Sequence, residues 1–590
     1  MKYIIVLLLL LVPTISYAHT EFNECCTMDQ RIDVASFEPI AESISGKSNA
    51  VIDKWMINEL KPEKVIDSIV NEPGVVTKDI TGLGSVRIRG SRSFDTKYLY
   101  DGFPLRDPSH TQSSFGSFFG DTLGFGDSEI QILKGTSSVL YGSEAIGGVV
   151  SIEPVHLDRM ESQTEYGSAE TFRQSFDSEP VSIEYGNSQK YETVNMRLSH
   201  QFENFKPFLI YQSTDAALHS SPSITNNSQS YDKRDENDRR ETKYYQTGIK
   251  ADMDDTHIKL SYSNSDRRFE FLPNSDGTGF WSDGSYIGES IFFDANSKIL
   301  GTIFGYSFTK DFLGIQSEGL KSDYSDQYKN DLYLERRFDF DNLSILSGLR
   351  HSINESSKDR TTYDLSASYH LNEYIIRSHF GTGFRAPSLY ELYGAYLSSS
   401  GRTESGNPYL SPERASSFDI GIEKTFNEKV TVGVTFFRHS LLNKIDYVSS
   451  TYKNVDGRLN TYGVESFYEH FLFGNSSLRL SHTRTVQPGM LDVAPYEFNI
   501  SYRVHKDKFE LFSGIGYKDD HQVAIYNNTT STTDKVYEDG SFNSYATLTY
   551  KINDNVSLYG RVENVFNQNY SDGGYRKEGF EAYAGFKVVV

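Results

Sequence analysis

The segment Ile130–Ile152 constrains the fold of this chain more than any other stretch. It reads IQILKGTSSVLYGSEAIGGVVSI, with β-branched and other apolar residues at both ends. Such runs are typical of buried strands, and the glycines between and beside them are typical of tight turns and close backbone approach. Because an isolated hairpin is only marginally stable in water, we expect these two strands to pack against a larger body.

Three motifs near the start of the chain share one family resemblance. The alternating run Val86–Gly90 precedes Tyr98–Leu105, which contains an Asp-Gly turn. Together with Ile130–Ile152 they resemble, in this order, the plug domain of TonB-dependent outer-membrane receptors, with Thr136 in place of the usual proline. The matching positions of the third motif are Lys134, Gly135, Thr136, Ser138, Tyr141, Gly142, Ala145, Gly147, Gly148, Val149, Ser151 and Ile152.

The chain from residue 156 onward contains many runs in which apolar and polar residues alternate. Clear examples lie at 418–423, 430–436 and 556–562, and aromatic residues make up 14% of the whole chain. Alternation of this kind is typical of strands that present one apolar face to lipid and one polar face to the lumen of a barrel. A soluble β-sandwich gives the same alternation. With the plug motifs, and because a plugged lumen goes with about 22 strands, the predicted fold class is all-β dominated. We expect a 22-stranded antiparallel transmembrane β-barrel with a small α/β plug domain in its lumen.

Two further motifs support the same resemblance in the second half of the chain. Gly383–Leu389 reads GFRAPSL, and Asn407–Leu410 reads NPYL, in the order that receptors of the family show. Arg561–Tyr570 is similar to the closing motif of the family. The chain departs from the pattern at Val590, where outer-membrane barrels usually place Phe or Trp.

The sequence also predicts how the chain is divided. Residues 1–18 combine a basic start, a short apolar core and a small-residue cleavage site, which indicates a signal peptide. We predict a periplasmic tail at 19–49, the plug domain at 50–155 and the barrel at 156–590, with a short helix near 62–70 that Pro73-Gly74 ends. Cys25 and Cys26 are adjacent and cannot build a disulfide framework.

Within the tail, the short β-prone stretch around Asp33, Val34, Ala35 and Ser36 loosely resembles the segment that TonB captures in this family. The physical mode would be β-augmentation, in which an extended peptide adds a strand to the edge of a partner's sheet. A plain linker is the alternative interpretation of these residues. The resemblance implies TonB as a partner, with ExbB and ExbD in the inner membrane.

The resemblance further implies a ligand site between plug loops and barrel loops. Rigid aromatic groups and small polar groups suit such a surface, whereas an ordinary solvated loop is the alternative. Arg87 and Arg89 are predicted to pair with carboxylates of the barrel wall. The candidate ligand-binding residues are Ser91, Arg92, Phe94, Ser109, His110, Gln112 and Phe115 on the plug, and Trp281, Tyr286, Tyr393 and Tyr396 on barrel loops.

The function implied by the resemblance is TonB-dependent uptake of a scarce nutrient through the outer membrane of a Gram-negative bacterium. Length and plug motifs favour a cobalamin or related corrinoid, then a ferric siderophore. Haem is a third alternative, although Ser388–Gly406 contains no histidine. A surface-binding or adhesin-type barrel without transport shares the same fold and stays open as a second interpretation.

Other function classes are disfavoured by the sequence. A net charge of −22 argues against a nucleic-acid partner. We find no Gly-x-Ser-x-Gly, His-Glu-x-x-His or P-loop motif, so an enzyme is not expected. The carboxylates of Asp232–Asp238 could hold Ca²⁺ but lack EF-hand spacing, and we predict neither a metal site nor a cofactor. The expected form is a monomer surrounded by outer-membrane lipid.

Overall fold

The computed structural model describes most of the chain from residue 46 to residue 590, all within the compact unit Glu38–Val590. The signal peptide, the tail and the TonB-interacting segment predicted from the sequence lie outside the described residues. The segments not described are 1–45, 81–82, 111–117, 119, 121, 124–127, 156–158, 190, 218–222, 226–227, 231–238, 272–281, 317–322, 399–400, 428, 473–474, 490, 492, 528–531, 569–570, 573–574 and 577–578.

The first part of the described chain forms a small mixed domain, the plug. Five strands make a sheet in the order β1-β6-β7-β4-β5, and β2 pairs with β3 in a separate hairpin. Strands β4 and β7 are parallel, and the other neighbours in both sheets are antiparallel. The elements are β1 (Asn49–Ile52), α3 (Lys54–Leu60), η1 (Val65–Ile69), β2 (Val75–Ile80), β3 (Leu83–Ile88), η2 (Ser93–Asp95), β4 (Thr96–Tyr100), β5 (Phe103–Pro104), β6 (Ser128–Lys134), α5 (Ser138–Tyr141) and β7 (Gly148–Pro154).

Local sequence explains these elements. The two strands expected in Ile130–Ile152 are β6 and β7, which pair directly from Ile130↔Ile152 to Lys134↔Gly148. Asp101 and Gly102 both adopt positive φ, so the Asp-Gly turn joins β4 to β5 as the sequence suggested. The helix expected near 62–70 is the 3-10 helix η1. Helix α3 was not expected from the sequence. It begins after Asp53, whose carboxylate accepts a hydrogen bond from the Met56 amide at 2.7 Å.

The rest of the described chain closes into one barrel. Among the described residues its wall has 22 strands, because β22 pairs directly with β25 while the hairpin β23–β24 joins the ring only through an extra pairing with β17. The predicted antiparallel 22-stranded barrel is confirmed. The wall strands are β8 (Glu161–Gly167), β9 (Thr171–Ser178), β10 (Val181–Asn187), β11 (Tyr191–Ser199), β12 (Phe205–Ala217), β15 (Arg239–Met253), β16 (Thr256–Phe271), β17 (Ser282–Ile299), β18 (Thr302–Ile315), β19 (Asp323–Phe340), β20 (Leu343–Asn354), β21 (Arg360–Leu371), β22 (Tyr374–Arg385), β25 (Glu413–Phe426), β26 (Val430–Val448), β27 (Thr451–Leu472), β28 (Ser476–Val486), β29 (Tyr496–Lys506), β30 (Phe509–Lys518), β33 (Ser541–Asn553), β34 (Val556–Glu563) and β37 (Glu581–Val589).

The two ends of the barrel differ in their connections. At one end the turns are short, such as Asp254-Asp255 between β15 and β16, and Leu300-Gly301 between β17 and β18. At the other end the connections 386–412 and 519–540 carry structure of their own, so we call it the long-loop end. The elements of its connections are β13 (Ser223–Thr225), β14 (Ser228–Ser230), α6 (Leu389–Tyr393), β23 (Ala395–Ser398), β24 (Gly401–Glu404), β31 (His521–Asn527), β32 (Thr532–Glu538), β35 (Ser571–Asp572) and β36 (Tyr575–Arg576).

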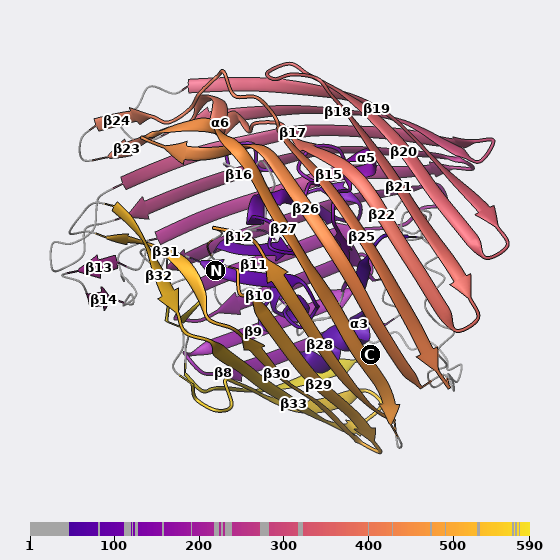
Figure 1. The fold of residues 1–590 in the computed structure, drawn as a ribbon. Coiled ribbons are helices and arrows are strands. Elements are labelled where there is room, and N and C mark those ends of the chain that lie inside the picture. The colour runs from indigo at the N-terminus through magenta and orange to yellow at the C-terminus, as the bar shows by residue number, and fades with distance from the viewer. Residues whose placement is uncertain are drawn as a thin grey trace. The chain divides into compact units, whose positions relative to one another are not determined.

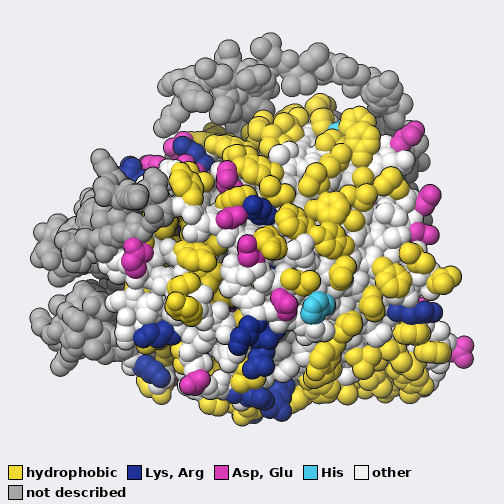
Figure 2. All heavy atoms as spheres, turned by 90° about the horizontal axis from the view of Figure 1, so that it is seen from above, with side chains coloured by type: hydrophobic (Ala, Val, Ile, Leu, Met, Phe, Trp, Pro, Cys, Tyr) yellow, Lys and Arg dark blue, Asp and Glu magenta, His cyan; other side chains and the backbone are white. Residues whose placement is uncertain are grey.

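The wall strands show the alternation that the sequence predicted. On β25, Phe418, Ile420 and Ile422 point outward and are exposed, whereas Asp419 between them is 1% exposed and faces the lumen. Figure 2 shows one outer face, where hydrophobic side chains are spread over much of the surface and charged ones lie singly or in small groups between them. An apolar outside and a polar lumen are what a membrane-spanning barrel requires.

The plug packs against the inner face of this wall. Its hydrophobic core joins Ile130, Ile132 and Ile152 to Phe208, Ile210 and Tyr244 of β12 and β15 in one buried cluster. Figure 1 shows the indigo plug elements surrounded by barrel strands. Within the described part of the chain, no helix has both the length and the apolar character needed to cross a membrane.

Candidate functional site

The first plug loop, between β3 and β4, meets the wall through a buried arginine. The Arg92 guanidinium binds both oxygens of Glu413, at 2.9 and 2.6 Å, and also pairs with Asp95 of η2. Arg385 of β22 donates to the same Glu413 at 2.7 Å and binds Glu391 of α6 with two nitrogens. Charge-assisted, two-pronged contacts of this kind fix geometry strongly, so they hold the loop against the start of β25.

The second plug loop is held by Arg267 of β16. Its guanidinium pairs with Asp107 at 2.5 Å and donates to the Ser109 hydroxyl at 2.9 Å. Burial and the neighbouring positive charge of Arg267 lower the pKa of His110 to about 3, so its imidazole is neutral at physiological pH. Both plug loops contact the wall near strand ends that lead into long connections, which places them toward the long-loop end.

A third arginine joins the plug to β18. Arg106 contacts both oxygens of Asp311, at 3.0 and 2.6 Å, and binds Glu144 of the plug at 3.1 Å. Lys97 lies nearby and donates to the Ser143 carbonyl at 3.3 Å, and burial lowers its pKa to about 7. Arg92, Arg106, Arg267 and Arg385 therefore each pair with at least one carboxylate.

A group of tyrosines, the tyrosine cluster, lies at the same end of the barrel. The ring of Tyr390 on α6 lies edge-on to those of Tyr286 and Tyr452, at 5.4 and 6.3 Å between centroids. The ring of Tyr447 is tilted by 59° to that of Tyr452, at 5.2 Å between centroids, and its hydroxyl lies 3.3 Å from the hydroxyl of Tyr396. The cluster combines apolar rings with hydroxyl groups, a composition that suits ligand walls.

Several candidate ligand residues lie near this region. The centre of the Phe94 ring lies 4.4 Å from the guanidinium carbon of Arg92 and 5.6 Å from that of Arg385. Ser91 is buried, and its hydroxyl accepts a hydrogen bond from the Ile88 amide. Tyr393, the last residue of α6, is exposed. Their roles toward a ligand stay predictions, and Gln112, Phe115 and Trp281 lie outside the described residues.

The expectation that Tyr286 lies in a barrel loop is wrong. Tyr286 belongs to β17, is 5% exposed, and its hydroxyl donates to the Ala395 carbonyl at 3.3 Å. Strand pairing of β16 with β17 continues to Phe271↔Ser282, so Tyr286 lies within the paired strand. The glycines Gly284 and Gly288 disguised this strand, because glycine is depleted in strands.

Deeper in the lumen, buried charges connect the plug to β21, β22, β25 and β27. Arg89 binds both oxygens of Glu465, at 2.9 and 3.0 Å, and Asp419 at 3.1 Å. Arg87 donates to the Leu491 carbonyl at 3.5 Å. Lys134 extends the group, lying 3.6 Å from Glu465.

The same group of charges reaches the N-terminal end of the described chain. Lys47 is 1% exposed and pairs with Asp364 at 2.9 Å. His379 lies between Asp364, at 2.9 Å, and Asp419, at 3.5 Å. We call Lys47, Asp364, His379, Asp419, Arg89 and Glu465 the buried network. Lys47 and the wall carboxylates were not predicted from the sequence. The signal for the carboxylates was that they occupy polar, lumen-facing positions of strands in which apolar and polar residues alternate.

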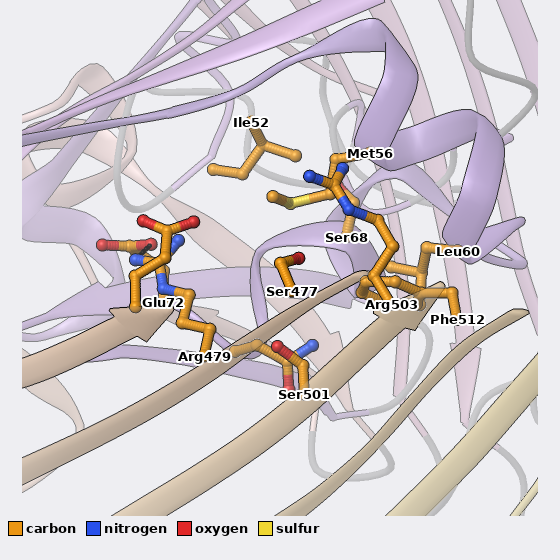
Figure 3. Close-up of a pocket in the computed structure, with 12 residues that line it drawn as sticks. Ile52, Met56, Leu60, Ser68, Glu72, Ser477, Arg479, Ser501, Arg503 and Phe512 are labelled. Carbon is orange, nitrogen blue, oxygen red and sulfur yellow. Dashed lines mark hydrogen bonds and ion pairs between the residues drawn. The ribbon is translucent and has the colours of Figure 1, made fainter. Parts of the chain in front are cut away.

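A different junction lies toward the short-turn end. Here β1, α3 and η1 of the plug face β28, β29 and β30, and a cavity of about 50 Å³ lies between them. Figure 3 shows Ile52, Met56 and Leu60 on the plug side, with Ser477 and Ser501 on the wall strands. We call this junction the seam. Within the described residues, no group of three or more His, Cys, Asp or Glu side chains is placed to hold a metal ion.

A closed barrel of 22 strands with a domain fixed in its lumen defines a plugged outer-membrane receptor. Comparison with known families agrees. Residues 184–503 match the family described as TonB dependent receptor-like, beta-barrel, and residues 43–149 match the TonB-dependent Receptor Plug Domain. The chain belongs to the TonB-dependent receptor family. It lies in the outer membrane of a Gram-negative bacterium and takes up a small-molecule nutrient with energy coupled through TonB.

Curated relatives and solved structures give two different kinds of similarity. The vitamin B12 transporter BtuB of Vibrio vulnificus is 25% identical over 506 residues, covering 78% of each chain, and that of Vibrio cholerae serotype O1 is 24% identical over 515 residues, covering 80% of each. A mutant of the ferric enterobactin receptor PfeA from Pseudomonas aeruginosa superposes with a TM-score of 0.74 at 14% identity, covering 93% of this chain and 99% of that one. The siderophore receptor PirA from Acinetobacter baumannii gives 0.72 at 16% identity, covering 92% and 98%. At such low identity the structures show the fold alone.

Proposed function

We propose that this receptor takes up cobalamin or a related corrinoid. The observation that carries the proposal is a set of paired charges around the plug loops: Arg92, Arg106, Arg267 and Arg385 each pair with a carboxylate. A ligand site whose positive charges are already paired with carboxylates suits a large ligand that presents amide groups better than it suits a highly anionic ligand. The similarity to vitamin B12 transporters over about four-fifths of both chains supports the same choice.

The tyrosine cluster and the plug loops supply the matching chemistry. Aromatic rings can cover apolar ligand surface, and burial contributes about 25 cal/mol per Å² before ordering costs are subtracted. Tyrosine and serine hydroxyls and the neutral His110 can exchange hydrogen bonds with amides. A ferric siderophore is the second candidate and haem the third, because an anionic ligand of either kind would compete with Glu413, Asp311 and Asp107 for the arginines.

Energy coupling is proposed to run through the tail. TonB would add a strand to Asp33–Ser36 by β-augmentation, with ExbB and ExbD supplying energy from the inner membrane. We propose that the mature protein works as a monomer without catalytic activity, cofactor or bound Ca²⁺. The proposed division is a signal peptide at 1–18, a tail at 19–49, a plug at 50–155 and a barrel at 156–590.

Uptake by cells tests the proposal directly. A deletion strain that carries the receptor on a plasmid should accumulate labelled cyanocobalamin, and the same strain without TonB should not. A ferric catechol siderophore and haem serve as comparison nutrients in parallel cultures. Accumulation of the siderophore with no accumulation of cyanocobalamin would replace the proposed substrate.

Two tail variants separate transport from binding alone. Deleting the tail to about Ser43 should abolish uptake but leave cyanocobalamin bound to intact cells. Val34→Pro should have the same effect, because proline removes a backbone donor and restricts the preceding residue. Normal uptake by the deletion variant would favour a surface-binding barrel in which the tail has no coupling role.

A double variant in the second plug loop tests whether this loop contacts the ligand. Phe115→Ala combined with His110→Ala should weaken cyanocobalamin binding to intact cells at an unchanged amount of surface receptor. The reason is the loss of an aromatic contact and of a neutral hydrogen-bonding imidazole. Unchanged affinity would place the ligand on the barrel loops alone.

A further inference from the structure

Four neighbouring strands of the wall present arginines to the outside of the barrel. Figure 1 shows β25, β26, β27 and β28 side by side across the front of the barrel. The residues on either side of Arg438 and of Arg484 along the strand are buried, so both arginines point away from the lumen. The exposed arginines, one on each strand, are Arg414, Arg438, Arg458 and Arg484. We call this surface the arginine face.

No opposing charge lies on the arginine face within the strands. The outward-facing positions of the described segments 414–426, 430–442, 458–472 and 476–486 include no Asp or Glu. Among the residues that the structure describes, none of the four arginines forms an ion pair. A chain whose net charge is −22 therefore keeps one sector of its outer surface positive.

An outward-facing cation at the same position on another strand is neutralised. Lys310 of β18 lies eight residues after the first residue of its strand, the position that Arg438 holds on β26 and Arg484 on β28. The ammonium group of Lys310 pairs with Asp326 of β19 at 3.1 Å. Because this carboxylate already balances its charge, Lys310 attracts a further anion less strongly than the unpaired arginines do.

The position of Arg438 and Arg484 along their strands places them near the outer edge of the membrane. The short turns of barrels of this kind face the periplasm, and the apolar band is about 25 Å tall. Strands rise about 3.4 Å per residue and tilt by about 40°, so eight residues place the two arginines about 20 Å from the short-turn end. The outward-facing side chains that precede Arg438 on β26 are apolar, namely Val430, Val432, Val434 and Phe436. The arginines therefore lie where the acyl chains end and the headgroups begin.

A tyrosine lies between these two arginines on the outer face. Tyr462 of β27 is directly opposite Arg438, and its partner on β28 is Val486, the next outward-facing residue after Arg484. Side chains directly opposite each other are about 5 Å apart and diagonal neighbours about 7 to 8 Å, which is within reach of long side chains. Tyr462 is 43% exposed. Two guanidinium groups and one phenol can therefore reach a single group bound between them.

We propose that the arginine face binds the phosphate groups of lipopolysaccharide, the phosphorylated glycolipid of the outer leaflet. Guanidinium groups donate two parallel hydrogen bonds to phosphate oxygens, and the phenol of Tyr462 supplies a further donor. Arg438, Tyr462 and Arg484 bind one phosphate. Arg414 and Arg458 both lie opposite Leu442, two outward positions further toward the long-loop end, where they meet anionic groups further from the acyl chains.

The apolar side chains below the arginines favour a lipid over a free phosphate ion. Phe418 and Ile420 of β25 are exposed on the same face as Phe436 of β26. Acyl chains attached to the bound headgroup would cover these side chains, whereas a free ion would leave them without a contact. The site is separate from the ligand site at the plug loops, and the proposal holds whichever nutrient the receptor takes up.

Titration of the purified, detergent-solubilised receptor with labelled lipopolysaccharide tests the proposal. Arg438→Gln combined with Arg484→Gln should bind at least about tenfold more weakly, because two cations near the headgroups are lost. The matched control Lys310→Gln should bind as the unmodified receptor does. Arg438→Lys combined with Arg484→Lys should lie between the two, because it keeps the charge but loses the two-pronged geometry. Far-UV spectra and heat-modifiable migration check that every variant is a folded barrel.

Two further probes identify the group that is bound. Lipopolysaccharide from which a phosphatase has removed the phosphates should bind the unmodified receptor as weakly as intact lipopolysaccharide binds the double glutamine variant. An excess of inorganic phosphate should not displace intact lipopolysaccharide.

Four results would overturn the proposal. Unchanged affinity in the double glutamine variant would place the lipid elsewhere. An equal loss in Lys310→Gln would show attraction by overall charge rather than a site. Equal binding of the phosphate-free lipid would exclude phosphate recognition, and displacement by inorganic phosphate would assign the arginines to a free anion.

Discussion

The buried network and the seam join the same plug to the same barrel with the same kinds of side chain. In the buried network, Arg89 places its guanidinium between Glu465 and Asp419, all at 6% exposure or less. At the seam, the arginines that bind Glu59 and Glu72 keep more than a quarter of their surface in contact with solvent. The number of ion pairs is therefore a poor guide to how firmly the plug is held, because the hydration of each pair sets how much it contributes.

The largest effect is expected from breaking the buried network at its centre. Arg89→Ala leaves Glu465 and Asp419 in the lumen without their main partner, and removal of one partner of a buried pair costs about 3 to 5 kcal/mol. Hydrogen exchange of the β3 amides should accelerate accordingly while that of the barrel strands stays unchanged. Exchange of β3 at the unmodified rate would show that the network contributes little to holding the plug.

A smaller effect is expected at the edge of the same network. Lys47→Ala leaves Asp364 with His379 as its remaining partner, and an incompletely paired buried group costs about 1 to 3 kcal/mol. Faster hydrogen exchange should be confined to β1, which follows Lys47 directly. Lys47→Arg is the control, because it keeps the charge; if it behaves like Lys47→Ala, the fit of the side chain matters more than its charge.

The next effect in order of size is the pH dependence of the local stability of η1. Burial, and then the nearby carboxylates Glu563 and Glu63, raise the pKa of Asp67 from 3.8 to about 7. Between these two values the unfolded chain releases a proton that the folded plug retains, so the free energy of opening η1 should fall as pH rises from 3.8 to about 7. Asp67 is half-buried, which limits the size of the effect.

Hydrogen exchange of η1 measured against pH checks this expectation. Asp67→Asn should remove the pH dependence, because the asparagine side chain does not titrate. The local structure should be kept, because the amide oxygen can still accept the hydrogen bond that the Lys64 amide donates at 2.9 Å. A slope that persists in Asp67→Asn would assign the titration to another group.

The smallest effect is expected at the seam. Arg503→Ala removes a partly exposed pair with Glu59, and such pairs contribute about 0.2 to 1 kcal/mol. Urea unfolding of the purified receptor should change little, and added salt should reduce the difference further. A loss as large as that of Arg89→Ala would remove the contrast between the two junctions.

The sequence predicted the fold well but the site only in part. The Lys134–Ile152 motif and the alternation of Phe418 with Asp419 depend on local patterns, and β6, β7 and β25 follow them. The partners of Arg89 lie 330 and 376 positions away in the chain. Closure of the 22-stranded ring determines which wall carboxylates lie beside Arg89. A single sequence carries no signal for this long-range contact. At Tyr286 the local pattern itself misled the prediction. Glycines on both sides of this residue suggested a loop, but the residue lies in a paired strand.

Closure of the ring itself has a consequence for how the protein is made. Strand β37, the last described strand to leave the ribosome, pairs with β8, and Met160 and Val590 exchange two backbone hydrogen bonds of 3.1 and 2.8 Å. A chain that stops before β37 would expose two unpaired strand edges in lipid, where each unsatisfied backbone group costs several kcal/mol. Insertion of a sealed ring therefore depends on β37, and we expect translation products that end before this strand to fail to insert into the membrane.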